Sequence, residues 1–262
     1  MLLSSVILVL REVLEAALLF SLLMALSKRL EISLRWVFVA LVIGVLGAAI
    51  CGFNTDRISE LFSGVGQEVL NAGMQYGIFV LLCGLGAAAV LSARGFPMPA
   101  YLLPGLMASS VIIALVREGS EIMIYLSGFL LGSDQWAAVL TGSAIGAGIG
   151  VSVGAVIYYA LITLNRRRVA IVGLVLLVLI AAGMVLQATE LLIQADWLPA
   201  AFPVWDTSEV LSEQSVAGQL LYALIGYEAT PTALQLGAYI TAVLLILGAV
   251  FTATRWPRDG IE

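Results

Sequence analysis

The sequence of 262 residues is 61% hydrophobic and 11% charged, with a net charge of -5, and its mean hydropathy is +1.08. About a quarter of the residues of a soluble domain are charged, so this composition excludes a water-soluble fold and favours membrane-spanning helices. The acidic balance and the lack of a polybasic segment exclude a nucleic-acid partner. Histidine is absent, which removes the common hydrolase and zinc-protease mechanisms, and we expect a protein that is not an enzyme and has no cofactor.

Apolar runs of roughly 20 residues, long enough to cross the ~30 Å hydrocarbon core of a bilayer, occur seven times. They cover residues 2–26, 34–53, 70–93, 106–131, 136–164, 169–193 and 234–254. The first run carries Arg11, Glu12 and Glu15 and lacks a basic start, so we expect a retained helix and not a cleaved signal peptide. The sequence predicts an all-α membrane protein, with residues 1–262 forming one transmembrane domain of seven helices.

A polar stretch at about 196–230 separates the sixth and seventh runs. Its Asp206-Thr-Ser-Glu segment and a later apolar run predict a short interfacial helix that begins at a capping residue. A re-entrant element is the alternative.

The basic residues predict the orientation in the membrane, because Lys and Arg near helix ends stay on the cytoplasmic side. With the N-terminus outside, 9 of the 12 basic residues fall inside: Lys28, Arg29, Arg35, Arg94, Arg166, Arg167, Arg168, Arg255 and Arg258. The outer loops then hold acidic residues such as Asp134, which would attract cations. We expect a multi-pass protein of the cytoplasmic (inner) membrane with its C-terminus in the cytoplasm.

One motif occurs twice, as Arg-Glu-Val-Leu-Glu at residues 11–15 and Arg-Glu-Gly-Ser-Glu at 117–121. The copies lie three spans apart, so the two helices that carry them run in opposite directions. This spacing predicts two inverted three-helix repeats, at about 1–95 and 104–195, an arrangement common in transporters, with the last helix outside them.

The charges of this motif lie near the middle of their spans, where each ionised side chain costs roughly 2.5 to 3.5 kcal/mol. At ~100° per residue, the arginine and both glutamates of a copy share one helix face. If the two helices face each other, four carboxylates meet two guanidinium groups and leave a net charge of about -2. The candidate metal ligands are Glu12, Glu15, Glu118 and Glu121, with Arg11 and Arg117 as their charge partners.

A site with oxygen ligands alone favours a hard cation such as ferric iron, manganese, magnesium or calcium over copper and zinc. Composition does not choose among these. Three alternatives stay open: arginines that only neutralise their glutamates and tie the two helices together, a proton-coupled carrier of another substrate or divalent metal, and a membrane scaffold subunit that transports nothing.

At these residues the chain resembles the oxidase-dependent iron permeases, the fungal high-affinity iron permeases and their bacterial EfeU-type relatives, whose hallmark is Arg-Glu-Gly-Leu-Glu in two helices. Residues 204–212, 218–227 and Pro231 resemble the last outer loop of that family and the start of its final helix. The resemblance implies iron import, with ferric iron the expected form, and the four glutamates as ligands. It also implies outer partners that oxidise or deliver iron. The oligomeric state stays open, and a homo-oligomer is one option.

Two departures from the family pattern concern packing and ligands. Val13 stands where the family has its first glycine, and Ser120 where it has its second leucine. The third span has Asn71 where relatives tend to carry a further acidic residue, so the sequence predicts no ligand from that helix.

Two further features complete the prediction. Glu190, near the outer end of the sixth span, is a candidate for a secondary cation site, and the alternative is an acid that reaches interfacial water. In the fifth span, Gly142, Gly146, Gly150 and Gly154 recur at every fourth residue and predict a face on which another helix packs closely.

Overall fold

The computed structural model of the protein describes residues 2–130 and 135–257, and these form helices and connecting loops without a β-strand. Within these ranges seven helices are 19 to 29 residues long. They are α1 (Leu2–Arg29), α2 (Arg35–Phe53), α4 (Gly66–Ala93), α5 (Leu102–Leu130), α6 (Trp136–Thr163), α7 (Arg166–Gln194) and α9 (Ala233–Arg255). The short elements are α3 (Thr55–Ser59), the 3₁₀ turn η1 (Leu61–Gly64) and α8 (Val216–Ile225). The prediction of an all-helical fold is confirmed.

Six of the long helices, α2, α4, α5, α6, α7 and α9, are long and apolar enough to cross a membrane. The seventh, α1, is 28 residues long but carries Arg11, Glu12 and Glu15 near its middle. The protein is therefore a multi-pass membrane protein.

Several helices begin earlier than the apolar runs indicate, because neither polar residues nor a proline in the first turn prevents a helix from starting. The sixth run was expected from residue 169, but α7 begins at Arg166, where the side chain of Asn165 accepts a hydrogen bond from the backbone N–H of Arg168 at 2.9 Å. The fourth was expected from residue 106, but α5 begins at Leu102. Pro104 lies in its first turn, where a missing N–H costs nothing.

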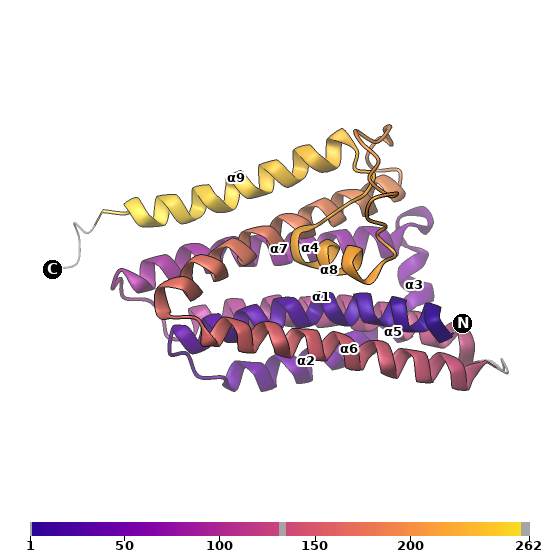
Figure 1. Ribbon diagram of the computed structural model, residues 1–262, viewed down its shortest axis with the longest axis horizontal. Coiled ribbons are helices and arrows are strands. Elements are labelled where there is room, and N and C mark those ends of the chain that lie inside the picture. The colour runs from indigo at the N-terminus through magenta and orange to yellow at the C-terminus, as the bar shows by residue number, and fades with distance from the viewer. Residues whose placement is uncertain (1, 131–134, 258–262) are drawn as a thin grey trace.

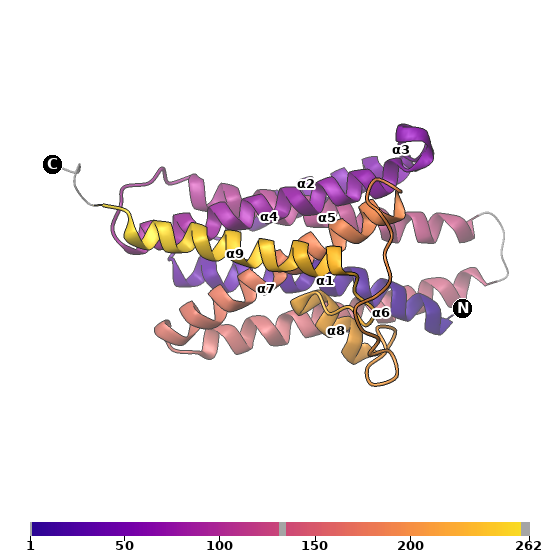
Figure 2. The same cartoon turned by 90° about the horizontal axis from the view of Figure 1, so that it is seen from above.

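The long helices run side by side along the long axis of the molecule, with the start of α1 and the end of α9 at opposite ends of the bundle (Figures 1 and 2). α1 packs along α6 and α2 along α5, while α4 and α7 pack on each other and on α9. The basic residues used for orientation gather at the end of the bundle opposite the N-terminus: Lys28 and Arg29 end α1, Arg35 begins α2, Arg94 follows α4 and Arg255 ends α9. Asp134 and Arg258 lie outside the described residues.

The glycines of α6 do bring two backbones together, as predicted. A Cβ atom on Gly142 would lie 2.5 Å from the carbonyl oxygen of Leu2, and one on Gly146 would lie 2.4 Å from that of Val6. Small residues also allow close packing between α2 and α5, where a Cβ on Gly44 would lie 2.7 Å from the Cβ of Leu115. The sequence prediction missed this second interface.

The segment between α7 and α9 differs from its prediction. The helix here begins at Val216 with Ser215 as its N-cap, and not at Asp206, whose side chain instead accepts hydrogen bonds from Ser208. α8 packs against α1 and α7 and ends at Ile225, with Gly226 as its C-cap at a φ of 67°. A Cβ on Gly226 would lie 2.6 Å from the Cα of Gly183, eleven residues before the end of α7, so α8 enters the bundle (Figure 1).

Candidate metal site

The two motifs face each other across the contact between α1 and α5, which run in opposite directions. Glu12 of α1 and Glu118 and Glu121 of α5 each offer one carboxylate oxygen, and these three oxygens all lie within 4.8 Å of one another. Glu12 is ten residues from the first residue of α1. At 1.5 Å per residue this is about 15 Å along the helix, half of the ~30 Å hydrocarbon thickness.

Glu15, the fourth predicted ligand, faces the arginines instead. One of its oxygens lies 3.5 Å from Nε of Arg11, and the other lies 3.2 Å from Nη1 of Arg117. The side chain of Glu15 is only 3% exposed. Both oxygens are thus occupied by cations of the protein, and the structure does not place Glu15 in the group of three.

Arg117 is the central cation of the site. Its Nη1 lies 2.5 Å from Glu118, and its Nε lies 3.6 Å from Glu121. Arg117 is buried, whereas the side chain of Arg11 is 43% exposed and stacks over the ring of Tyr222 in α8, with 4.4 Å between the guanidinium carbon and the ring centroid. One buried arginine therefore forms ion pairs with three carboxylates, those of Glu15, Glu118 and Glu121.

Two carboxylate oxygens of the group lack partners. Glu12 and Glu118 are buried, and within the described part of the chain their Oε2 atoms accept no hydrogen bond. An unsatisfied buried carboxylate oxygen is costly, because its hydration has been removed without replacement. A bound cation or proton would restore the lost interaction, so the chemistry of the donor set fits a hard metal ion.

Helix α4 also reaches the group, which the sequence prediction did not anticipate. Nδ2 of Asn71 donates a hydrogen bond to Oε1 of Glu121 at 2.9 Å. Two features of the sequence pointed to Asn71: its polar character within an apolar run, and its position where relatives tend to carry an acidic residue. One turn further along α4, Gln75 donates to Gln187 of α7 at 2.6 Å, so these two helices are joined inside the bundle.

Two cavities lie close to the group, and one of them is lined by two of its carboxylates. A cavity of about 660 Å³ lies between α1, α2, α5 and α6, with Glu12 and Glu118 in its wall, and it extends past Phe20 to Met24 in the second half of α1. A cavity of about 20 Å³ lies toward the α3 end, and Asn71 and Ser120 are in its wall. The larger cavity therefore reaches two of the carboxylates directly, while the small cavity is connected to the group through Asn71, which is hydrogen-bonded to Glu121.

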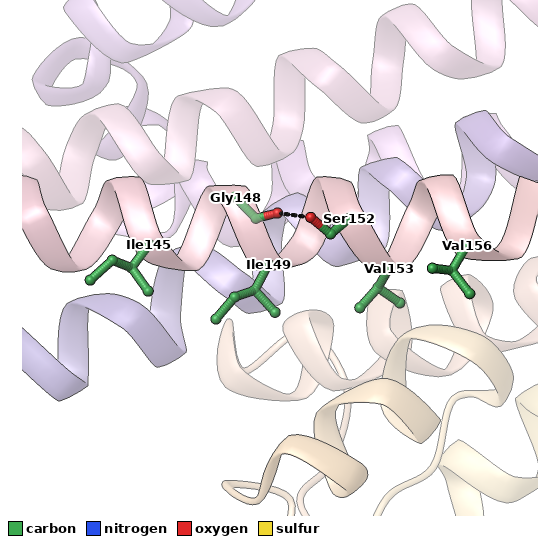
Figure 3. A pocket seen from close by; sticks show the side chains of 6 residues that line it. All are labelled: Ile145, Gly148, Ile149, Ser152, Val153 and Val156. Atoms are coloured by element: carbon green, nitrogen blue, oxygen red, sulfur yellow. Dashed lines mark hydrogen bonds between the residues drawn. The ribbon is translucent and has the colours of Figure 1, made fainter.

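A third, shallow depression lies on the surface of α6 away from the carboxylates (Figure 3). Its wall is aliphatic except for Ser152, whose hydroxyl donates to the carbonyl of Gly148 at 2.7 Å. It contains no ionisable side chain, so it does not fit a cation.

Glu190 does not belong to the group of three. It lies in the last turns of α7, is partly exposed, and accepts a hydrogen bond from Gln194 at 3.1 Å. Nearby, Glu213 accepts a hydrogen bond from the backbone N–H of Ala229. Burial, together with the charges of Glu190 and Glu213, raises the pKa of Glu228 to about 8.

Comparison with known proteins identifies the family. Residues 103–257 match the model of the iron permease FTR1 family. The ferrous iron permease EfeU of Yersinia pestis is 27% identical over 94% of this chain and 92% of its own length. That of Escherichia coli O157:H7 is 24% identical over 97% of this chain and 96% of its own length.

No solved structure matches the chain. The family match covers more than half of the sequence, and the similarity to the permeases extends over nearly all of it. The sequence resemblance is thereby confirmed, and the chain belongs to the iron permease FTR1 family.

Proposed function

We propose that this protein imports iron across the cytoplasmic membrane through a site formed by Glu12, Glu118 and Glu121. The observation that carries the proposal is the approach of three carboxylate oxygens to within 4.8 Å. Small side-chain movements would place each oxygen roughly 2.0 to 2.6 Å from an ion bound between them, the distance at which oxygen ligands hold hard cations. Glu12 and Glu118 have oxygens free to accept the ion.

In this proposal the remaining motif residues lower the electrostatic repulsion among the carboxylates when no ion is bound. Arg117 offsets part of the negative charge, and Glu15 is held between Arg117 and Arg11. Four carboxylates against two arginines leave an excess of negative charge, so protons occupy the empty site and an incoming cation displaces them. Glu15 then acts as a counter-ion and not as a direct ligand.

The proposed architecture has seven spans, with α1 as the first, and an outer N-terminus. If α1, α2 and α4 correspond to α5, α6 and α7, the packing of α1 on α6 corresponds to that of α5 on α2, and α4 packs on its own counterpart. This pairing supports two inverted repeats followed by α9. Import would involve movement of one repeat against the other, with the glycine-lined face of α6 as a sliding surface.

The ion in the proposal is ferrous iron, because the curated relatives are named ferrous iron permeases. Ferric iron, the form expected from the sequence, is the second candidate and is favoured by the all-oxygen ligand set, since it is the harder cation. Outer proteins that deliver iron would supply the ion in either case, and outer proteins that oxidise iron would supply it only in the ferric case. Glu190 remains a candidate for a secondary site at the outer end of α7.

Uptake of radioactive iron into proteoliposomes tests the proposal. We expect Glu12→Gln and Glu118→Gln to reduce uptake at least tenfold, since each removes a charged ligand, while Glu60→Gln, at an exposed residue near α3, leaves it unchanged. Assays with and without ascorbate separate ferrous from ferric iron. Equal iron flux in wild type and both site variants would overturn the site assignment, and a wild type that carries no iron would point to another substrate or to a scaffold.

A further inference from the structure

Asn71 is the side chain through which α4 contacts the carboxylate group. Its Nδ2 lies 2.9 Å from Oε1 of Glu121. A carboxamide donating to a carboxylate makes a charge-assisted bond, which is shorter and stronger than a bond between neutral groups. Asn71 thus fixes the direction of the Glu121 side chain.

Glu121 needs this restraint more than the other members of the group. Its side chain is 31% exposed, compared with 3% for Glu118. Its contact with Nε of Arg117, at 3.6 Å, is longer than a hydrogen bond. A partly exposed glutamate with only this loose ion pair would sample several rotamers, so the hydrogen bond from Asn71 holds Glu121 toward Glu12 and Glu118.

The small cavity beside Asn71 lies toward the α3 end of the bundle, where the chain also begins (Figure 1). Its wall includes the polar side chains of Thr55, Gln67, Asn71 and Ser120. Apart from Glu12 and Glu118 themselves, the larger cavity is walled almost entirely by aliphatic and aromatic side chains. A cation loses less hydration energy beside hydroxyl and amide groups than beside hydrocarbon, so the small cavity is the more favourable approach.

We propose that iron reaches the carboxylates through the cavity beside Asn71, and that Asn71 is a positioning residue which holds Glu121 as the first carboxylate that the ion meets. This inference rests on the proposed function, because it assumes that the group binds iron. It assigns a role in substrate capture to a neutral side chain of α4 that lies outside both motifs.

Kinetics of iron uptake test the role of Asn71. Asn71→Leu keeps the volume but removes the donor, and we expect the KM for iron to rise about tenfold with Vmax within twofold of wild type, since a bond to a charged group is lost. Asn71→Gln retains a carboxamide and should restore most of the affinity. Gln75→Leu is the matched control, because it removes a buried hydrogen bond of the same helix and should leave KM unchanged.

Two results would overturn the positioning role: a wild-type KM in Asn71→Leu, or a rise in KM that Gln75→Leu reproduces. Failure of the positioning role can be distinguished from failure of the proposed function. If Glu118→Gln transports iron normally, the site itself is wrong. If Glu118→Gln fails while Asn71→Leu transports with wild-type KM, only the role of Asn71 is wrong.

Cys51, which also lines the small cavity, allows a test of the route. Cys51 and Cys83 are both free thiols, so Cys83→Ser leaves Cys51 as the single cysteine. We expect a positively charged, membrane-impermeant methanethiosulfonate added outside to modify Cys51 and to block uptake, and iron to slow the modification. The Cys51→Ser, Cys83→Ser protein should be unaffected. Full modification without loss of uptake, or a Cys51 that the reagent never reaches, would contradict the route.

Discussion

At the scale of single residues, Arg117 is the buried cation that offsets the negative charge of the surrounding carboxylates. It contacts Glu15, Glu118 and Glu121 and is itself buried. The helical spacing of the motifs predicted that the arginines and glutamates would meet. It could not predict that Glu15 would be shared between both arginines, or that Asn71 would reach Glu121, because these contacts depend on how three separate helices are rotated about their axes.

Replacing Arg117 therefore tests whether Glu15 is a counter-ion. Arg117→Met leaves three carboxylates without their common partner, and we expect a loss of stability of about 3 to 5 kcal/mol, the usual cost of breaking a buried ion pair. Adding Glu15→Gln removes one of the stranded charges and should recover part of the loss. Thermal unfolding of the purified proteins in detergent measures both effects. No recovery in the double variant would argue against this role for Glu15.

At the scale of elements, the long helices follow the apolar runs closely, because each run must bury its backbone hydrogen bonds inside one helix. The segment between α7 and α9 was harder to predict. Its structure depends on tertiary contacts: the backbone of Gly226 lies against Gly183, and Val204 and Thr207 donate backbone hydrogen bonds to Pro231 and Ala229. Nothing in the local sequence specifies those distant partners.

The pKa of Glu228 predicts how the segment between α7 and α9 responds to pH. Burial and the charges of Glu190 and Glu213 raise this pKa from its usual 4.5 to about 8, while Arg11 acts in the opposite direction. The docked segment holds its proton more tightly than the released one, so docking weakens as the pH rises from about 4.5 to 8. Hydrogen exchange of residues 203–232, corrected for intrinsic rates, should show falling protection over this range. Glu228→Gln should remove the dependence, and stronger protection at high pH would contradict the assignment.

At the scale of the whole molecule, the bundle brings two distant copies of one motif into contact near the middle of α1 and α5. The close packing of α1 on α6 and of α2 on α5 makes this contact possible, since small residues let each pair of backbones approach. The sequence predicted the helices, the direction of the two motif helices and the glycine face of α6. The pairing of helices was not predictable, because apolar faces alone do not specify which neighbour they contact.

The central claim is that Glu12, Glu118 and Glu121 together bind iron. Equilibrium binding of iron to the purified protein measures this directly, without dependence on transport. We expect saturable binding to the wild type and to Glu60→Gln, and an affinity lower by at least about tenfold in Glu118→Gln. Wild-type affinity in Glu118→Gln would contradict the account.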